Sequence, residues 1–268
     1  MDVFQAIMIA LVEGITEYIP VSSTGHMIFV SSFFDIQNED FTKLFQVAIQ
    51  FGAILAVVFL YWKKFFNFSK WSFYIKLAIG VIPALALGVL FDDAIDSVLG
   101  KPIPIAVALI VGGIFLLFID QLFNKPQVTE ETQITNRQAL FIGLWQCLAM
   151  MPGTSRSAAS IVGGMQQKLS REAAAEFSFF LAVPTMLAVT VYALLIKSYH
   201  AGEKGFELLF NHKGHLQLFL IGNVVAFLVA VFAIKFFIGV IKKYGFKPWG
   251  YYRIVVGIIL LLYFNFKS

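Results

Sequence analysis

Charged residues and cysteine are both scarce in this chain. Of its 268 residues, 13% are charged and 59% are hydrophobic, whereas soluble domains are typically about 25% charged and about 45–50% apolar. With a mean hydropathy of +0.81, the composition excludes an ordinary water-soluble domain. The single cysteine, Cys147, excludes a disulfide framework. Because it lies in an apolar stretch, we expect it to fill space in the core.

Several motifs that accompany soluble functions are also missing. The chain has no phosphate-binding P-loop, no dinucleotide fingerprint and no Cys/His spacing typical of a zinc site. Its net charge of +4 is modest and is better interpreted through its position in loops than as a surface for nucleic acid. We therefore expect no nucleotide-driven pump, no organic cofactor and no nucleic-acid partner.

Long segments with little or no charge predict six membrane-spanning helices. Each is close to the ~20 residues that a helix needs to cross the hydrocarbon core of a bilayer. The segments are 45–62, 71–91, 102–119, 177–196, 216–234 and 254–266, the last extended backwards by 249–253. We expect a single all-α, multi-pass membrane domain over residues 1–268.

Two further apolar regions are each interrupted by a short run rich in proline, glycine and hydroxyl side chains. The runs are 20–25, within the region 3–34, and 152–157, within the region 138–167. The part of each region after its interruption is too short to cross ~30 Å at 1.5 Å per residue. This favours two re-entrant helix-loop-helix hairpins, whose broken backbone must line a cavity or be buried in protein. The alternative is ten ordinary spans with proline kinks.

Basic residues in the short loops predict the orientation. Lysine and arginine gather in the connections 63–70, 168–171 and 242–247, which lie on one face and should therefore be cytoplasmic. Both termini and the 197–214 loop would then lie outside. That loop carries three lysines, so the chain follows the rule imperfectly.

An offset of 132 residues relates the two interrupted regions. It pairs Pro20 with Pro152, Ser23 with Ser155, and the string 55–57 with 187–189. We therefore expect one repeat over approximately 1–124 and a second over approximately 133–268. Each half would contain an odd number of spans, which predicts an inverted-topology repeat. Transporters with this plan place their site at the midplane, where half-helix N-termini face an anion.

The first interrupted region carries acids and a histidine. Glu13 and Glu17 are one helical turn apart, and two carboxylates at such depth require a proton, a cation or water. A helix facing an aqueous vestibule would explain them equally. Before His26, the run Ser22-Ser23-Thr24-Gly25 supplies hydroxyls that can cap the next half-helix and a glycine for a tight backbone path. Beside two acids, the histidine is a candidate for proton transfer or nucleophilic attack, the alternative being a packing role.

The second interrupted region carries one arginine. Arg156 is the only charge between residues 138 and 167, and its burial costs at least ~2.5–3.5 kcal/mol on insertion scales. It therefore needs an anionic partner, which is either one of the two glutamates or a phosphate. A phosphate would also find the hydroxyls of Thr154, Ser155 and Ser157 and the N-terminus of the following half-helix.

The segments 13–26 (EGITEYIPVSSTGH) and 152–157 (PGTSRS) resemble the two signature motifs of the bacterial undecaprenyl-diphosphatase, or bacitracin-resistance, family. Segments 176–184 and 252–254 also resemble family segments, so that the likeness covers nearly the whole chain. It implies hydrolysis of undecaprenyl diphosphate to the monophosphate, the lipid carrier for peptidoglycan, in the bacterial inner membrane. It also implies a site open to the outer face.

The resemblance also implies roles for particular residues. Glu13 and Glu17 match the acidic motif, Ser23 and His26 match the nucleophile or base positions, Ser155 and Arg156 match the phosphate-binding motif, and Arg253 matches a further basic position. The expected substrate contacts are Ser22, Thr24, Gly25, Gly153, Thr154, Ser155, Ser157, Ser160 and Arg253, where Ser160 replaces the threonine that usually closes the second motif.

The expected mechanism has Arg156 and the half-helix N-termini clamping the diphosphate. His26 or Ser23 then attacks or activates the attacking group, with Glu17 as orienting group or proton acceptor and Glu13 in support. The nucleophile stays open between histidine, serine and water. Glu13 and Glu17 could also hold Mg²⁺ or Ca²⁺ together with phosphate oxygens. A homodimer stays open too.

The main rival is a flippase or secondary transporter of a prenyl phosphate or another anionic lipid, since an inverted repeat suits alternating access. A channel is a weaker third. Transport of an anion needs the arginine and the helix N-termini but no nucleophile. The presence of His26 and the two glutamates therefore favours hydrolysis over transport.

Overall fold

The structure is a computed structural model that describes residues 1–91, 98 and 101–267. Within these ranges the chain is helical and has no β-strand, only two isolated bridges. The α-helices are α1 (Val3–Thr16), α2 (Ser23–Phe33), α3 (Asp40–Ala48), α4 (Gln50–Leu60), α5 (Trp62–Phe65), α6 (Trp71–Leu90), α8 (Pro102–Leu122), α9 (Asn136–Gln146), α10 (Arg156–Gln166), α11 (Arg171–Leu195), α12 (Gly205–Phe210), α13 (His215–Tyr244) and α14 (Lys247–Lys267). Short 3-10 turns η1 (Glu131–Gln133), η2 (Cys147–Met150) and η3 (His200–Gly202) lie between them.

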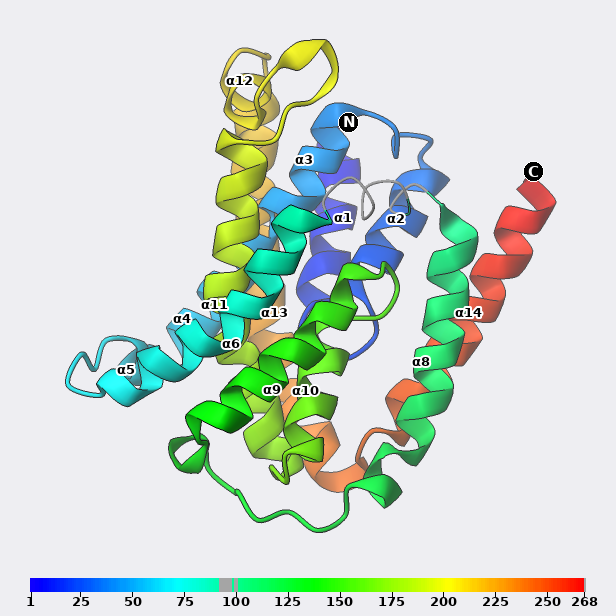
Figure 1. Ribbon diagram of the computed structural model, residues 1–268. Helices are drawn as coiled ribbons and strands as arrows, with labels where there is room; N and C mark the ends of the chain where they lie inside the picture. Colours follow the sequence, from blue (N-terminus) through cyan, green and yellow to red (C-terminus); the bar gives the residue numbers. More distant parts are fainter. Residues whose placement is uncertain (92–97, 99–100, 268) are drawn as a thin grey trace.

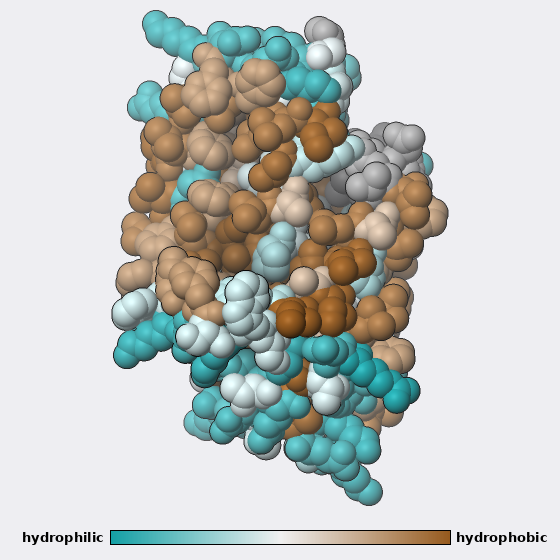
Figure 2. All heavy atoms as spheres, turned by 60° about the vertical axis from the view of Figure 1, so that its left-hand side comes forward, coloured by the Kyte–Doolittle hydropathy of each residue, from teal (hydrophilic) through white to brown (hydrophobic). Residues whose placement is uncertain are grey.

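Six segments of the described chain are long and apolar enough to cross a membrane. They are Asp40–Leu60, Trp71–Gly88, Pro102–Leu122, Arg171–Leu195, His215–Tyr244 and Lys247–Phe266. The six helices predicted from the sequence are thus confirmed by length and composition. Figure 2 shows their outer face as a broad apolar zone with hydrophilic side chains at both ends of the molecule.

The two interrupted regions fold into two helical hairpins. In Figure 1, α1 descends from the N-terminus and α2 returns upward, while α9 rises from the opposite end and α10 returns downward. The tips of the hairpins meet inside the molecule, where the Ser157 hydroxyl donates a hydrogen bond of 3.0 Å to the Ile19 carbonyl. Two segments about 130 residues apart in sequence therefore form one contact region.

The first arm of each hairpin packs on a different long helix through small residues. Gly14 of α1 lies against α13, where an added Cβ would come within 2.8 Å of the Ala226 carbonyl. Gly143 of α9 lies against Gly80 of α6 so closely that no Cβ would fit. Small residues allow this close backbone approach, which is the usual basis of helix packing in membranes. Helices α8 and α14 pack along each other as a separate pair at one side (Figure 1).

Each hairpin tip ends in a serine that caps the second arm with a positive φ. Ser22 has φ 70° and accepts a hydrogen bond from the Gly25 N–H, and Ser155 has φ 76° and accepts one from the Ala158 N–H. In its capping role Ser155 therefore corresponds to Ser22 rather than Ser23. The second tip has one more residue between its proline and its cap, which moves the local offset from 132 to 133.

Candidate active site

The tips of the two hairpins bring Glu17, Ser23 and Arg156 into direct contact. The Ser23 hydroxyl donates to Glu17 Oε2 over 2.5 Å. The Arg156 guanidinium donates to Glu17 Oε1 from Nε over 3.2 Å and from Nη2 over 3.0 Å. The side chains of Glu17 and Arg156 are only 5% and 11% exposed, so this ion pair is shielded from water and strong. These three residues are called the tip cluster below.

Hydroxyl groups of α10 and α11 extend the tip cluster behind Arg156. Nη1 of Arg156 donates to the Ser178 carbonyl over 3.0 Å, and the Ser178 hydroxyl lies 2.6 Å from the Ser160 hydroxyl. Tyr18 lies beneath, with the guanidinium carbon 5.8 Å from its ring centroid. Arg156 is therefore held from several sides, which fixes the direction of its remaining N–H groups.

Glu13 lies one turn before Glu17 and is fully buried. Neither of its carboxylate oxygens has a hydrogen-bond partner among the described residues. A buried carboxylate of this kind is costly unless a proton or a cation accompanies it. Both carboxylate oxygens of Glu13 are thus able to accept a proton or bind a cation.

His26 lies in the first turn of α2, three residues after Ser23, and its hydrogen-bond partners are outside the tip cluster. Its Nδ1 is 2.8 Å from the Ser22 carbonyl, and its Nε2 is 2.9 Å from the Tyr252 hydroxyl on α14. The two rings are stacked, 5.7 Å apart with an interplanar angle of 8°. No hydrogen bond joins His26 to Glu17 or Arg156 within the described structure.

Arg253 of α14 joins both hairpin tips to α8. It is fully buried, and all five of its N–H groups donate to backbone carbonyls. The acceptors are Leu109 and Ala108 of α8, Pro20 of the first tip, and Gly153 and Thr154 of the second tip, at 2.9 to 3.3 Å. No N–H is left for a phosphate. In this structure Arg253 therefore acts as a clamp on the backbone of both tips, and its contact with the substrate stays a prediction.

Two glycines make the clamp possible. Gly112 of α8 leaves the space that the Arg253 guanidinium fills, since a Cβ there would overlap Nη2. Gly153 has a φ of +93°, and a Cβ there would lie 2.5 Å from the Ile105 carbonyl. A residue with a side chain is strained at such a φ, so the second tip can approach α8 only with glycine at this position.

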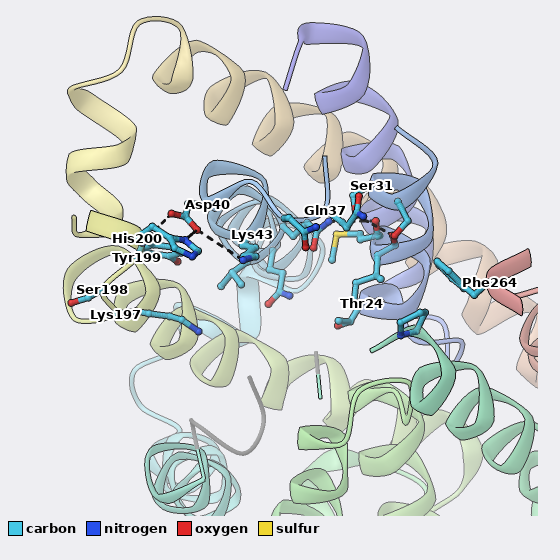
Figure 3. A pocket seen from close by; sticks show the side chains of 18 of the residues that line it. Thr24, Ser31, Gln37, Asp40, Lys43, Lys197, Ser198, Tyr199, His200 and Phe264 are labelled. Carbon is cyan, nitrogen blue, oxygen red and sulfur yellow. Dashed lines mark hydrogen bonds and ion pairs between the residues drawn. The ribbon is translucent and has the colours of Figure 1, made fainter. Parts of the chain in front are cut away.

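The remaining predicted substrate contacts lie around the same tips. Ser22 and Ser155 are the two caps, and the Ser155 hydroxyl is also 3.1 Å from that of Ser157. Gly25 lies against Ile105 of α8. Thr24 lines a cavity of about 910 Å³ between α2, α3 and the ends of α8 and α11, shown in Figure 3.

A protein-family model described as "Bacitracin resistance protein BacA" matches residues 6–259. This range includes every residue of the tip cluster and the two α14 residues described above, Tyr252 and Arg253. The chain belongs to the BacA family. Proteins named undecaprenyl-diphosphatase are similar over nearly the whole chain, among them those of Flavobacterium johnsoniae, at 58% identity over 98% of this chain and 96% of the relative, and of Porphyromonas gingivalis, at 50% over the same shares. That of Enterococcus faecalis is 42% identical over 97% and 96%.

In this BacA family member, the site also contains residues that the sequence analysis did not select. Ser178 and Tyr18 support Arg156, Tyr252 contacts His26, and Gly112 houses Arg253. Tyr18, Ser178 and Tyr252 all lie within segments that resemble the family, so the sequence carries a signal for each of them. Gly112 lies in an apolar span, where a glycine is common.

Proposed function

We propose that this protein hydrolyses undecaprenyl diphosphate to undecaprenyl phosphate and inorganic phosphate, and so returns the lipid carrier to peptidoglycan synthesis. The observation that carries the proposal is the tip cluster, in which a hydroxyl, a carboxylate and a guanidinium from the two hairpins are in contact and buried. A nucleophile beside a base and an arginine is the arrangement that phosphoryl transfer needs. The relatives' phosphatase names agree with it, whereas a flippase or transporter would need no hydroxyl paired with a base.

In the proposed reaction each residue has one step. Ser23 Oγ attacks the terminal phosphorus while its proton passes to Glu17 Oε2, and the bond from that phosphorus to the bridging oxygen breaks, so that undecaprenyl phosphate leaves as an anion. Water then attacks the phosphorus of the phosphoserine and gives a proton to His26 Nε2. The bond from that phosphorus to Ser23 Oγ breaks, Oγ recovers its proton from Glu17, inorganic phosphate leaves, and His26 returns its proton to the solvent. Arg156 and the N-termini of α2 and α10 stabilise the charge on the transferred phosphoryl group.

Phosphate release by the purified protein in detergent tests this function, because no sealed compartment exists there to support transport. The wild type should release phosphate from a prenyl diphosphate. Ser23→Ala should lower the rate at least ~10²-fold, the usual effect of losing a group that takes part in proton transfer or attack. Ser72→Ala, an exposed serine of α6, is the matched control and should keep the wild-type rate. No release by the wild type, or full release by Ser23→Ala, would contradict the proposal.

The glutamates fit a divalent cation only in part. Among the described residues no group of three histidine, cysteine, aspartate or glutamate side chains lies together, so the protein alone offers no complete site. Mg²⁺, however, is commonly held by one or two carboxylates plus substrate phosphates. Glu13, with both oxygens unpartnered, would hold the ion together with the diphosphate. When bound, the ion would neutralise phosphate charge.

Removal of divalent cations is therefore expected to lower phosphate release strongly, and Mg²⁺ or Ca²⁺ should restore it. Glu13→Gln should weaken the dependence on added cation, since the amide is a poorer ligand for a hard ion. The measurement is the release rate against cation concentration after treatment with EDTA. A wild-type rate that EDTA leaves unchanged would rule out the cation.

We also propose that the two hairpins are re-entrant, that the halves 1–124 and 133–268 form an inverted repeat, and that the site opens outward. The matched packing of α1 on α13 and α9 on α6 supports the repeat. The cavity that Thr24 lines also contacts Lys197 and His200, just after α11. That end of the molecule carries both termini in Figure 1, whereas the basic 242–247 connection lies at the other end. An outward site suits a substrate whose headgroup is exposed outside the cell.

Cysteine labelling tests the orientation. In a Cys147→Ser background, Phe66→Cys in the basic connection should react with a membrane-impermeant reagent only after the cells are permeabilised. Phe66 is 60% exposed, so that reagent access is not limited by burial. Lys213→Cys, an exposed position in the loop before α13, should react in intact cells. If position 66 reacts in intact cells and position 213 reacts only after permeabilisation, the proposed outward opening is wrong.

A further inference from the structure

Tyr252 is the residue near the site whose role is least explained by the reaction above. It lies on α14, the last helix of the chain, and reaches across to the first hairpin, 226 residues away in sequence, where its hydroxyl is 2.9 Å from His26 Nε2. Its side chain is 43% exposed. A tyrosine hydroxyl that is open to solvent can bond to water and does not require a protein partner. The contact is therefore better explained by its effect on His26.

The other nitrogen of His26 fixes which atom carries the hydrogen. The Ser22 carbonyl, 2.8 Å from Nδ1, can only accept a hydrogen bond, so Nδ1 must be the N–H of the neutral ring. Nε2 is then the atom with the lone pair, and the Tyr252 hydroxyl donates to it. The stacking of the two rings, within 8° of parallel, holds the imidazole plane as well as its edge.

Arg253 keeps Tyr252 in place. It follows Tyr252 directly on α14, and its five hydrogen bonds tie this turn of the helix to α8 and to both hairpin tips. Tyr252, the residue before Arg253, therefore cannot shift relative to α2 without breaking the clamp. Two adjacent residues of one helix thus fix the backbone of both tips and the ring of His26.

We infer that Tyr252 is a positioning residue that presents His26 Nε2 as a proton acceptor. The inference rests on the proposed function, because it needs His26 to accept a proton from water during phosphoserine hydrolysis. The hydroxyl occupies Nε2 in the resting state and keeps it from other donors. On substrate binding the incoming water replaces the hydroxyl at an atom whose direction is already set, which saves the cost of orienting the ring.

Tyr252→Phe removes the hydroxyl and keeps the ring, so the stacking and the fold should survive. The expected result is a kcat lower by roughly 3- to 10-fold, the equivalent of one hydrogen bond between neutral groups, with KM unchanged because Tyr252 does not bind the substrate. Tyr251→Phe is the matched control. Tyr251 is the exposed neighbour on α14, it has no hydrogen bond among the described residues, and its variant should behave as the wild type.

A double-mutant cycle separates positioning from a general effect on structure. If Tyr252 acts through His26, then Tyr252→Phe should have no further effect on kcat in a His26→Ala background. Equal fold-losses in both backgrounds, or a wild-type kcat for Tyr252→Phe, would overturn the inference while leaving the phosphatase function intact.

Nitrogen-15 NMR of histidine-labelled protein gives a readout that does not depend on activity. The chain has four histidines, and His26→Ala identifies the resonances of residue 26. In the wild type, these should report a neutral ring with the hydrogen on Nδ1, and Tyr252→Phe should shift the Nε2 resonance alone. An unchanged Nε2 resonance would refute the contact. If the wild type releases no phosphate but Tyr252→Phe still shifts the Nε2 resonance, the proposed function and the catalytic role of Tyr252 are refuted. The contact between Tyr252 and His26 would still stand.

Discussion

Replacement of Arg156 by alanine is expected to lower phosphate release by at least ~10³-fold, the lower bound for an arginine that stabilises a transferred phosphoryl group. The structure gives Arg156 a direction as well as a charge. Two of its N–H groups hold Glu17 and a third holds the Ser178 carbonyl. The guanidinium is therefore fixed before the substrate arrives, and such preorganised charge is worth more in a site shielded from water.

Arg156→Ala also leaves Glu17 buried without its ion pair, which typically costs about 3–5 kcal/mol. The loss of stability can be separated from the loss of catalysis by adding Glu17→Gln, which removes the stranded charge. The double variant should recover most of the Tm in detergent but none of the activity. Arg156→Lys keeps a charge without the planar fork and should recover only part of the rate.

The matched control for Arg156 is Arg137 at the start of α9. It is exposed, and its guanidinium carbon lies 5.8 Å from the ring centroid of Phe141. Arg137→Ala should leave both the rate and the Tm within error of the wild type. An Arg156→Ala protein that folds and retains more than a tenth of the wild-type rate would show that the phosphate is held elsewhere.

Replacement of Arg253 by methionine is expected to lower the Tm by about 10 °C and phosphate release by more than ~10²-fold. Methionine fills much of the same space but donates no hydrogen bond. The carbonyls of Pro20, Gly153 and Thr154 in the two tips then lose their donor, at about 1 kcal/mol or more each. A loss of ~3 kcal/mol corresponds to a shift of roughly 6–12 °C for a domain of this size. Activity falls because both tips can move.

Gly112→Ala reaches the same clamp without changing any charge, because the added Cβ would displace the guanidinium. It should lower Tm and activity together, as Arg253→Met does. Gly239→Ala in α13 is the control, since a Cβ at that position meets nothing within 4 Å. If Arg253 instead touched the phosphate, Arg253→Lys would raise KM at an unchanged Tm, and that result would refute the clamp.

The spans of this fold could be predicted from the sequence, because a helix that crosses a bilayer must be apolar along its length and that property is local. The breaks at 20–25 and 152–157 could be found for the same reason. The sequence also left Arg156 with two alternative partners, a glutamate or a phosphate. In the structure the partner is Glu17, and the two alternatives are compatible, since a guanidinium held by one anion still faces the site.

The contacts of α14 could not be predicted, because they depend on tertiary packing. The sequence around Arg253 does not show whether its N–H groups meet backbone carbonyls or a phosphate. A buried arginine would have the same apolar neighbours in the sequence in both cases. The pairing of Tyr252 with His26 likewise joins positions 226 residues apart. The prolines of the two tips align at an offset of 132, whereas the caps Ser22 and Ser155 align at 133. A loop of unequal length is not visible in an ungapped comparison.

The position of the clamp on the last helix has a consequence for how the enzyme is made. The N-terminal hairpin is synthesised first and the second hairpin about halfway, but the residue that ties their tips together is Arg253. Until α14 has been inserted and packed against α8, the two tips lack their common anchor. We therefore expect a chain that lacks α14 to be inactive toward prenyl diphosphates, because its two tips are not yet tied together.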